Sequence, residues 1–191
     1  MVPQEIARLR AWNGEPLRPG LAGRLTRETA SVKGVEERMR MLVRERKALL
    51  RHSPDRAVAK ARKMMKLRGI GVESAWVFAM EFFGWRQFRN VREVGALAGL
   101  SPTMHGSGDL QRELGISKAG NRLVRAMIIE IAWGWLRYQP DSEITLWYRQ
   151  RFGEGSRQRR TGIVALSRKL LIALWKYVER DELPAGAVLR D

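Results

Sequence analysis

The sequence of 191 residues contains no cysteine and only two histidines, His52 and His105. Without cysteine, disulfide scaffolds, thiolate zinc sites and thiol nucleophiles are excluded. Two histidines this far apart do not favour a histidine-based metal site, and we predict none. No apolar run reaches the roughly 18 residues of a membrane-spanning helix, and the amino-terminal residues lack the apolar stretch of a secretory signal. We therefore expect a cytoplasmic protein with no membrane partner.

Acidic residues are few compared with basic ones. The chain has 36 Lys plus Arg against 20 Asp plus Glu, a formal net charge of +16 and a pI of about 11.3. Such an excess requires an anionic partner, and nucleic acid is favoured because phosphate neutralisation releases counterions. An acidic companion subunit remains the alternative. A hydrophobic content of 45% with seven Trp is sufficient for the core of one domain.

Helical periodicity dominates the chain, and no segment alternates for long enough to predict a strand. We expect an irregular lead-in at 1–20, a long helix at 21–53, a helical domain at 54–180 and a tail at 181–191. Apolar residues repeat with heptad spacing over 21–50, interrupted by Glu28 and Arg46, which predicts a coiled-coil-like helix. We expect it to form homo-oligomers, the alternative being that it packs back on its own domain. The predicted fold is all-α, with this long helix followed by a compact bundle of short helices.

A Gly-Ile-Gly turn at 69–71 joins two of the short helices. It resembles a helix-hairpin-helix, a DNA-binding element of repair and recombination proteins. Gly69 and Gly71 allow tight backbone angles and the close approach of a phosphate, which amides of the next helix would bind. The preceding helix is basic and includes Lys66, which favours DNA binding. A tight corner between helices without a ligand is the alternative.

A glycine-rich stretch at 99–116 has no periodicity and contains Ser107 between Gly106 and Gly108. Loops of this length inside a domain are commonly functional. The flexible backbone could present the Ser107 hydroxyl as a nucleophile, although Gly-Ser-Gly is more often only a turn. His105 could be proposed as a general base, but a loop histidine without a partner is the favoured interpretation.

A helix capped by Ser117 and reaching Tyr138 is expected after this stretch. Lys118, Arg122 and Arg125 would form one stripe near its amino terminus, where the helix dipole also favours anions. Phosphoryl transfer to serine requires a nucleophile beside such positive charge. We therefore predict that these three cations contact DNA.

The last third of the chain combines basic residues with tryptophans. The segment 149–169 carries seven basic residues against Glu154 and ends on Arg168 and Lys169. We interpret it as a nucleic-acid track, the alternative being a solvated face. Four tryptophans on helical segments are expected in the core, namely Trp133, Trp135, Trp147 and Trp175.

Six separated blocks follow one another over about residues 56–180. They are Leu67-Arg68-Gly69-Ile70-Gly71 with Ala75, Trp85-Arg86-Gln87-Phe88, Gly99-Leu100-Ser101-Pro102, Ser107-Gly108, Gly115-Ile116-Ser117-Lys118-Ala119-Gly120-Asn121 with Arg125, and Arg168-Lys169-Leu170. The series resembles the C-terminal transposase domain of the insertion-sequence one-ten family, the DEDD or Piv-like transposases. The helix at 21–50 is similar to the coiled-coil spacer that precedes this domain in the family.

The resemblance implies DNA transposition and recombination by an enzyme that a structured bridge RNA guides in studied members. It implies that Ser107 attacks DNA and forms a phosphoserine intermediate, and that Gly69 and Gly71 belong to the helix-hairpin-helix. It also extends the expected DNA contacts to Asn121, and it places the protein at the bacterial nucleoid. His105 is not part of the recurring pattern.

The family's first half is a ribonuclease-H-like domain whose four acids bind magnesium, and the present sequence has no counterpart of it. We expect magnesium only through a separate ribonuclease-H-like polypeptide, since this chain is expected to bind no cofactor itself. The chain would then be part of a split enzyme, an isolated domain or a decayed element. Two alternatives are a non-catalytic helix-hairpin-helix module that binds nucleic acid and a basic structural subunit with an acidic partner.

Overall fold

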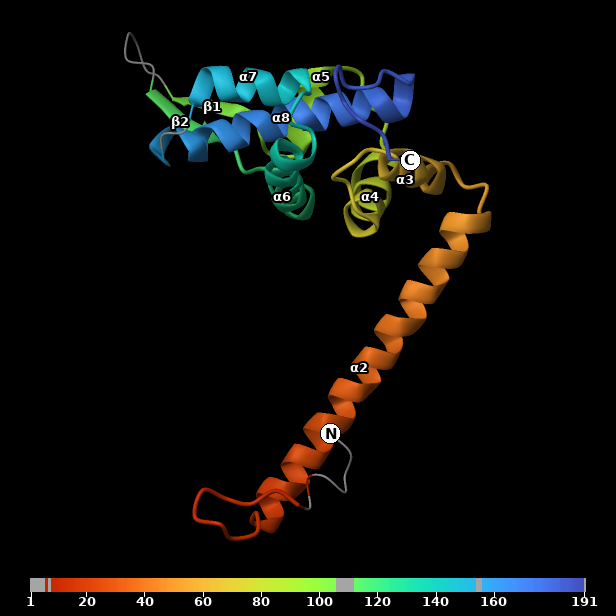
Figure 1. The fold of residues 1–191 in the computed structure, drawn as a ribbon, viewed down its shortest axis with the longest axis vertical. Coiled ribbons are helices and arrows are strands. Elements are labelled where there is room, and N and C mark those ends of the chain that lie inside the picture. The colour runs from red at the N-terminus through yellow and green to blue at the C-terminus, as the bar shows by residue number, and fades with distance from the viewer. Residues whose placement is uncertain (1–5, 7, 106–111, 154–155, 191) are drawn as a thin grey trace. The chain divides into compact units, whose positions relative to one another are not determined.

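The structure, a computed structural model, describes residues 6, 8–105, 112–153 and 156–190 (Figure 1). Its elements are α2 (Pro19–His52), α3 (Arg56–Met65), α4 (Val72–Phe78), the π-helix η1 (Ala79–Phe83), α5 (Val91–Leu97), β1 (Pro102–His105), β2 (Arg112–Ile116), α6 (Arg122–Tyr138), α7 (Glu143–Phe152) and α8 (Ser156–Arg180). The predicted all-α class, a long helix followed by shorter ones, is confirmed. The chain divides into two units, Met1–His52 and Ser53–Asp191.

The first unit is dominated by α2, a helix of 34 residues. It ends at His52 because the following Ser53-Pro54 pair disfavours helical geometry. None of its residues is buried, and apolar residues of the heptad row are largely exposed, including Val32 at 57%, Met39 at 60% and Leu42 at 63%. An apolar row of this kind, left in water, is typical of a helix that packs against a partner.

The second unit is built around α8, which contacts α3, α5, α6 and α7 (Figure 1). Leu166, Leu170 and Leu174 of α8 are fully buried and recur at the spacing of one helix face. Phe82 and Phe83 are also fully buried, with ring centroids 5.3 Å apart. The core therefore depends on contacts between segments far apart in sequence, with α8 in the middle.

Two tryptophans occupy the core as predicted and two do not. Trp135 is fully buried and Trp175 is 3% exposed. Trp147 is half-buried, and the prediction for Trp133 is wrong because 44% of it is exposed. Ala132, the preceding residue of α6, is fully buried. Successive helical residues point about 100° apart, so the Trp133 ring points away from the core.

A short antiparallel hairpin replaces the irregular stretch expected at 99–116. β1 and β2 pair Pro102 with Ile116 and Met104 with Glu113, with an irregularity between the first two pairs. Strands of four and five residues are too short to show a period of two in the sequence. Residues 106–111, which include Ser107, lie outside the described residues.

The helix that follows begins later than predicted. Its N-cap is Asn121, whose Oδ1 accepts a hydrogen bond of 3.0 Å from the Val124 amide. Ser117 does not cap it, because Lys118 and Gly120 adopt φ angles of +55° and +110° that an α-helix cannot contain. Lys118 therefore does not share a helical stripe with Arg122 and Arg125, and this part of the prediction is wrong.

Candidate nucleic-acid interface

The base of the β-hairpin is held between the end of α5 and the start of α6. The Asn121 amide donates to Leu97 O at 2.9 Å, and the Ser117 amide donates to Ser101 O at 2.9 Å. A Cβ at Gly120 would lie 2.3 Å from Leu97 O, so only glycine permits this approach at a positive φ. The hairpin thus leaves the helical core from a closely packed base.

Arg125 fixes the same base from α6. Its Nη1 donates to Ala98 O at 3.2 Å and to Lys118 O at 3.0 Å, one carbonyl on each side of the hairpin. Hydrogen bonds from a charged donor are among the stronger ones in proteins. Arg125 and the capping Asn121 were predicted to contact DNA, and the structure gives both a contact within the chain. Arg122, one turn before, is exposed.

A groove with a volume of about 760 Å³ opens between the hairpin base, α7 and α8. Its apolar lining includes Leu100, Ile116 and Val164. Three predicted DNA-contacting cations, Lys118, Arg168 and Lys169, also line it. These residues come from two segments about 50 positions apart, and folding brings them to one surface. The groove therefore combines an apolar floor with cationic side chains.

Packing positions two of these cations. Arg168 lies against α5, where a Cβ on Gly95 would come within 3.0 Å of its Nε. The Nζ of Lys169 lies 4.6 Å from the centroid of the Trp147 ring, a cation–π contact. Trp147 itself packs edge-on against Phe152. No local pattern indicates that Trp147 belongs to this site, because its contact with Lys169 joins α7 to α8.

Among the residues that the structure describes, none of those lining the groove is acidic. The described lining is therefore positively charged, and it favours an anionic ligand. Among residues 6, 8–105, 112–153 and 156–190, no cluster of three or more His, Asp or Glu side chains could hold a metal ion. The chemistry that this arrangement offers is the binding of anions through Lys and Arg.

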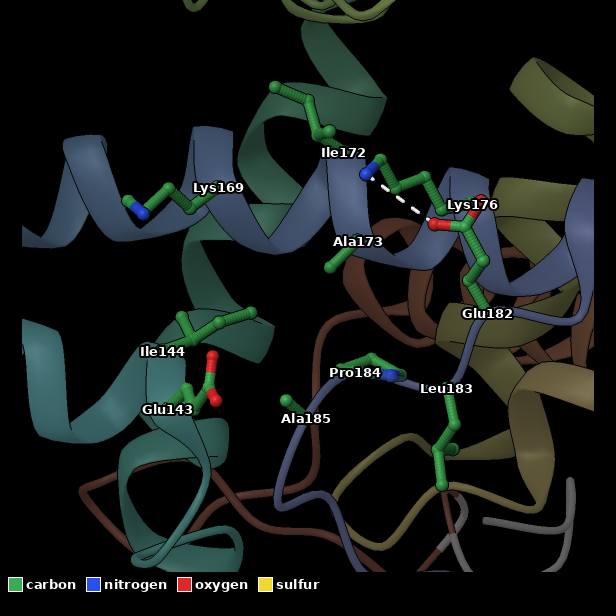
Figure 2. A pocket seen from close by; sticks show the side chains of 10 residues that line it. All are labelled: Glu143, Ile144, Lys169, Ile172, Ala173, Lys176, Glu182, Leu183, Pro184 and Ala185. Atoms are coloured by element: carbon green, nitrogen blue, oxygen red, sulfur yellow. Dashed lines mark ion pairs between the residues drawn. The ribbon is translucent and has the colours of Figure 1, made fainter.

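A neighbouring hollow of about 420 Å³ lies between α7, α8 and the carboxy-terminal segment (Figure 2). It shares Lys169 with the groove and adds Lys176, Glu143 and Glu182. Lys176 Nζ and Glu182 Oε2 form an ion pair of 3.4 Å, drawn as a dashed line in Figure 2. Two cations facing two carboxylates leave no surplus charge, so this hollow is a weaker candidate for binding phosphate.

The Gly-Ile-Gly turn is tightly packed, since Leu67, Ile70 and Ala75 are fully buried. Gly69 has a φ of +93°, and a Cβ there would lie 3.2 Å from Tyr138 Cβ. Gly71 is exposed, with no atom within 4 Å of the place where a Cβ would be. One glycine is therefore used for packing, while the other leaves the backbone open to solvent.

The carboxy-terminal segment, expected to be a tail, is bound to this turn. Arg190 donates from its amide to Lys66 O at 2.7 Å and from Nη2 to Ile70 O at 2.8 Å. Gln139 Nε2 bridges Arg68 O and Val188 O at 2.8 Å each. These contacts cover part of the turn's backbone, and no local pattern in the sequence indicates them.

Most of the basic residues of α3 make contacts inside the chain. Lys60 is buried, donates to Phe83 O at 2.6 Å and pairs with Glu179. Arg62 donates to Ser53 O at 2.7 Å, and Lys63 pairs with Asp181. Lys66 is exposed. The basic residues of this helix therefore stabilise the fold, whereas their clustering in the sequence favours DNA binding.

The described part of the chain is a basic helical domain that carries a cationic groove, and no helix in it is long and apolar enough to cross a membrane. Residues 61–145 match the sequence model of the IS116/IS110/IS902 transposase family, and the chain carries the domain of that family.

Three proteins show how far the similarity extends. The chain is 37% identical over 194 residues to y4rJ of Sinorhizobium fredii, a protein named as a candidate transposase, with 97% of this chain and 49% of that protein covered. It is 31% identical over 167 residues to a protein of Pseudomonas aeruginosa named as a probable family 20 transposase, covering 85% of this chain and 47% of that protein. It is 30% identical over 133 residues to the transposase for insertion sequence element IS1111A of Coxiella burnetii, covering 66% of this chain and 36% of that protein. The chain thus spans half or less of the length of each.

Proposed function

We propose that this chain is the DNA-binding, serine-bearing part of a transposase. The observation that carries the proposal is the groove, where Lys118, Arg168 and Lys169 lie beside apolar residues and no acidic side chain is among the described lining residues. Such cations bind phosphodiesters, and the family of residues 61–145 moves DNA. DNA is the proposed partner, and nucleoid association follows from it.

The proposed chemistry is phosphoryl transfer to Ser107. Its Oγ attacks a phosphodiester, a P–Oγ bond forms, and the bond from phosphorus to one deoxyribose oxygen breaks. The serine gives up its proton, and the departing oxygen takes one up. The groove includes residues at the base of both strands that flank residues 106–111. Its cations would stabilise charge on the phosphate oxygens.

Two further partners complete the proposal. Magnesium would come from a separate ribonuclease-H-like polypeptide, because the described residues offer no acidic cluster of their own. A structured guide RNA would present the same phosphate chemistry as DNA to the cationic surface.

At the Gly-Ile-Gly turn, the exposed backbone of Gly71 and the nearby Lys66 are the groups proposed to contact a flanking phosphate in a helix-hairpin-helix.

The chemical proposal is tested by trapping the covalent intermediate. The chain is incubated with insertion-sequence end DNA, magnesium and a ribonuclease-H-like partner, and the products are resolved under denaturing conditions. We expect a protein–DNA adduct that Ser107→Ala abolishes, whereas Ser101→Ala, a serine at the hairpin base, retains it. An adduct that persists in Ser107→Ala would contradict the assignment of the nucleophile.

A non-catalytic nucleic-acid-binding module is the second candidate function. It is favoured by the fact that the described residues hold cations at the groove but no acidic cluster. DNA binding without an adduct in any combination of partner and metal would support this module. The two candidates therefore differ in chemistry and share the same groove.

A further inference from the structure

A second cationic hollow, of about 300 Å³, lies between α3, the segment after η1 and the end of α8. It shares no lining residue with the groove. Its charged and aromatic lining consists of Arg56, Lys60, Arg86, Arg180, Glu179, Trp85, Phe88 and Trp175. Nothing in the proposed chemistry uses these residues, yet they concentrate positive charge and aromatic rings in one place.

The charges of this hollow do not balance. Glu179 is the one carboxylate among the described residues that line it, and it already pairs with Lys60 and, at 3.2 Å, with Arg56. Arg180 also pairs at 3.8 Å with Glu182, which lies outside the lining. Among the described residues, four cations therefore face these two carboxylates, and a surplus of two positive charges remains. The Nε of Arg86 is buried and has no hydrogen-bond partner. An anion would therefore find uncompensated donors here.

An exposed tryptophan, Trp85, lines the same hollow beside these cations. Trp85 is 65% exposed, and the Cζ of Arg86 lies 4.3 Å from the centroid of its ring. Gly84 makes this placement possible, since a Cβ there would lie 2.6 Å from Ala57 Cβ on α3 and 2.3 Å from Ala79 O. The close packing of Gly84 against α3 places the Trp85 ring in solvent directly after η1. Single π-helical turns are frequent at functional sites.

We infer that this hollow binds one unpaired nucleotide of a single-stranded nucleic acid, with its base stacked on Trp85 and its phosphate held by Arg86 and Arg180. The inference rests on the proposed function that the chain binds nucleic acid. Stacking on an exposed aromatic ring needs a free base face, which an unpaired base has and a base inside a duplex does not. Arginine suits both tasks because its planar group stacks on rings and binds phosphate.

The test measures fluorescence anisotropy of the full chain with labelled single-stranded (dT)12, single-stranded (rU)12 and a 12-base-pair duplex. We expect Trp85→Ala to weaken binding of at least one single strand about tenfold or more, the size of one lost base stack. Duplex affinity should change less than about twofold, because paired bases do not use the ring. Trp85→Phe, which keeps an aromatic ring, should retain most of the affinity.

Matched variants control for the loss of an exposed ring and of a charge. Trp12 is 98% exposed and lies in the other unit, so Trp12→Ala should leave single-strand binding unchanged. Arg89 is exposed but does not line the hollow, so Arg89→Gln should weaken binding much less than Arg86→Gln. The comparison of (dT)12 with (rU)12 distinguishes DNA from RNA as the source of the nucleotide.

The inference is overturned if Trp85→Ala binds both single strands as tightly as Trp12→Ala does, or if duplex affinity falls in parallel. A change in sedimentation of Trp85→Ala without a change in single-strand binding would identify the ring as a contact between proteins and overturn it too. Duplex binding without single-strand binding refutes this inference alone. Failure to bind any nucleic acid refutes the proposed function as well.

Discussion

At the scale of single residues, the same side-chain type lines the groove at one position and supports the fold at another. Lys118, Arg168 and Lys169 were identified from the sequence, and they do line one groove. Arg125 belonged to the same prediction, yet its guanidinium donates to two carbonyls at the hairpin base. The difference depends on whether the fold brings backbone oxygens within 3.2 Å of the guanidinium. The pattern of charges along the chain does not indicate this.

Arg125 therefore has a structural effect that can be measured. We expect Arg125→Met to lower the free energy of unfolding by about 1–2 kcal/mol, since the partly buried Ala98 carbonyl and the exposed Lys118 carbonyl lose a charged donor. Arg122→Met on the same helix is the control, because Arg122 is exposed, and its effect should stay within about 0.5 kcal/mol. Urea titration followed by circular dichroism gives both values. Equal effects in the two variants would remove the structural role assigned to Arg125.

Tyr177 on α8 links the fold to pH. Burial, and secondarily the negative charge of Asp181, raise the pKa of the Tyr177 hydroxyl above its ordinary value of 10.0. The folded state thus binds this proton more tightly than the unfolded state does. This difference stabilises the folded state below pH 10, and the stabilisation is lost as pH rises through the folded pKa. We expect the free energy of unfolding to decline above about pH 10, and to decline less in Tyr177→Phe. Identical pH profiles would contradict this.

At the scale of elements, long periodic helices were predictable and short irregular pieces were not. The helix at 21–53 was predicted within two residues of α2 because its period repeats over four heptads. The hairpin and the start of α6 were missed, since they depend on left-handed angles at Lys118 and Gly120. The binding of the carboxy-terminal segment through Arg190 and Gln139 is long-range and leaves no local pattern.

The exposed heptad row of α2 supports the proposal that residues 21–50 form a homo-oligomer. Leu42 lies in the row and is 63% exposed, whereas the adjacent Met41 lies outside it and is 53% exposed. We expect Leu42→Lys to shift the chain towards monomer in analytical ultracentrifugation, because a charge would be buried at the helix contact. Met41→Lys should leave the distribution unchanged. A monomeric wild-type chain, or equal effects of both variants, would contradict the proposal.

At the scale of the whole molecule, the basic residues behind the net charge of +16 fall into two groups. Some pair with carboxylates inside the chain, and others line the groove. Much of the charge of α3 is paired within the chain, while the part of the groove lining that the structure describes has no carboxylate. The composition could predict an anionic partner, but not which cations remain available to it. That distinction requires the fold, since the partners of Lys60 and Lys63 come from the end of α8 and beyond.

The most direct test of the central claim, that the groove binds DNA phosphates, is the salt dependence of duplex binding. The groove variant replaces Lys118, Arg168 and Lys169 by Gln. The control removes the same charge from the exposed Arg8, Arg10 and Arg18 of the other unit. If three phosphate contacts are lost, the slope of log K against log salt should become shallower by about 2.7 in the groove variant. The control should keep nearly the wild-type slope and affinity, and a groove variant indistinguishable from that control would contradict the claim.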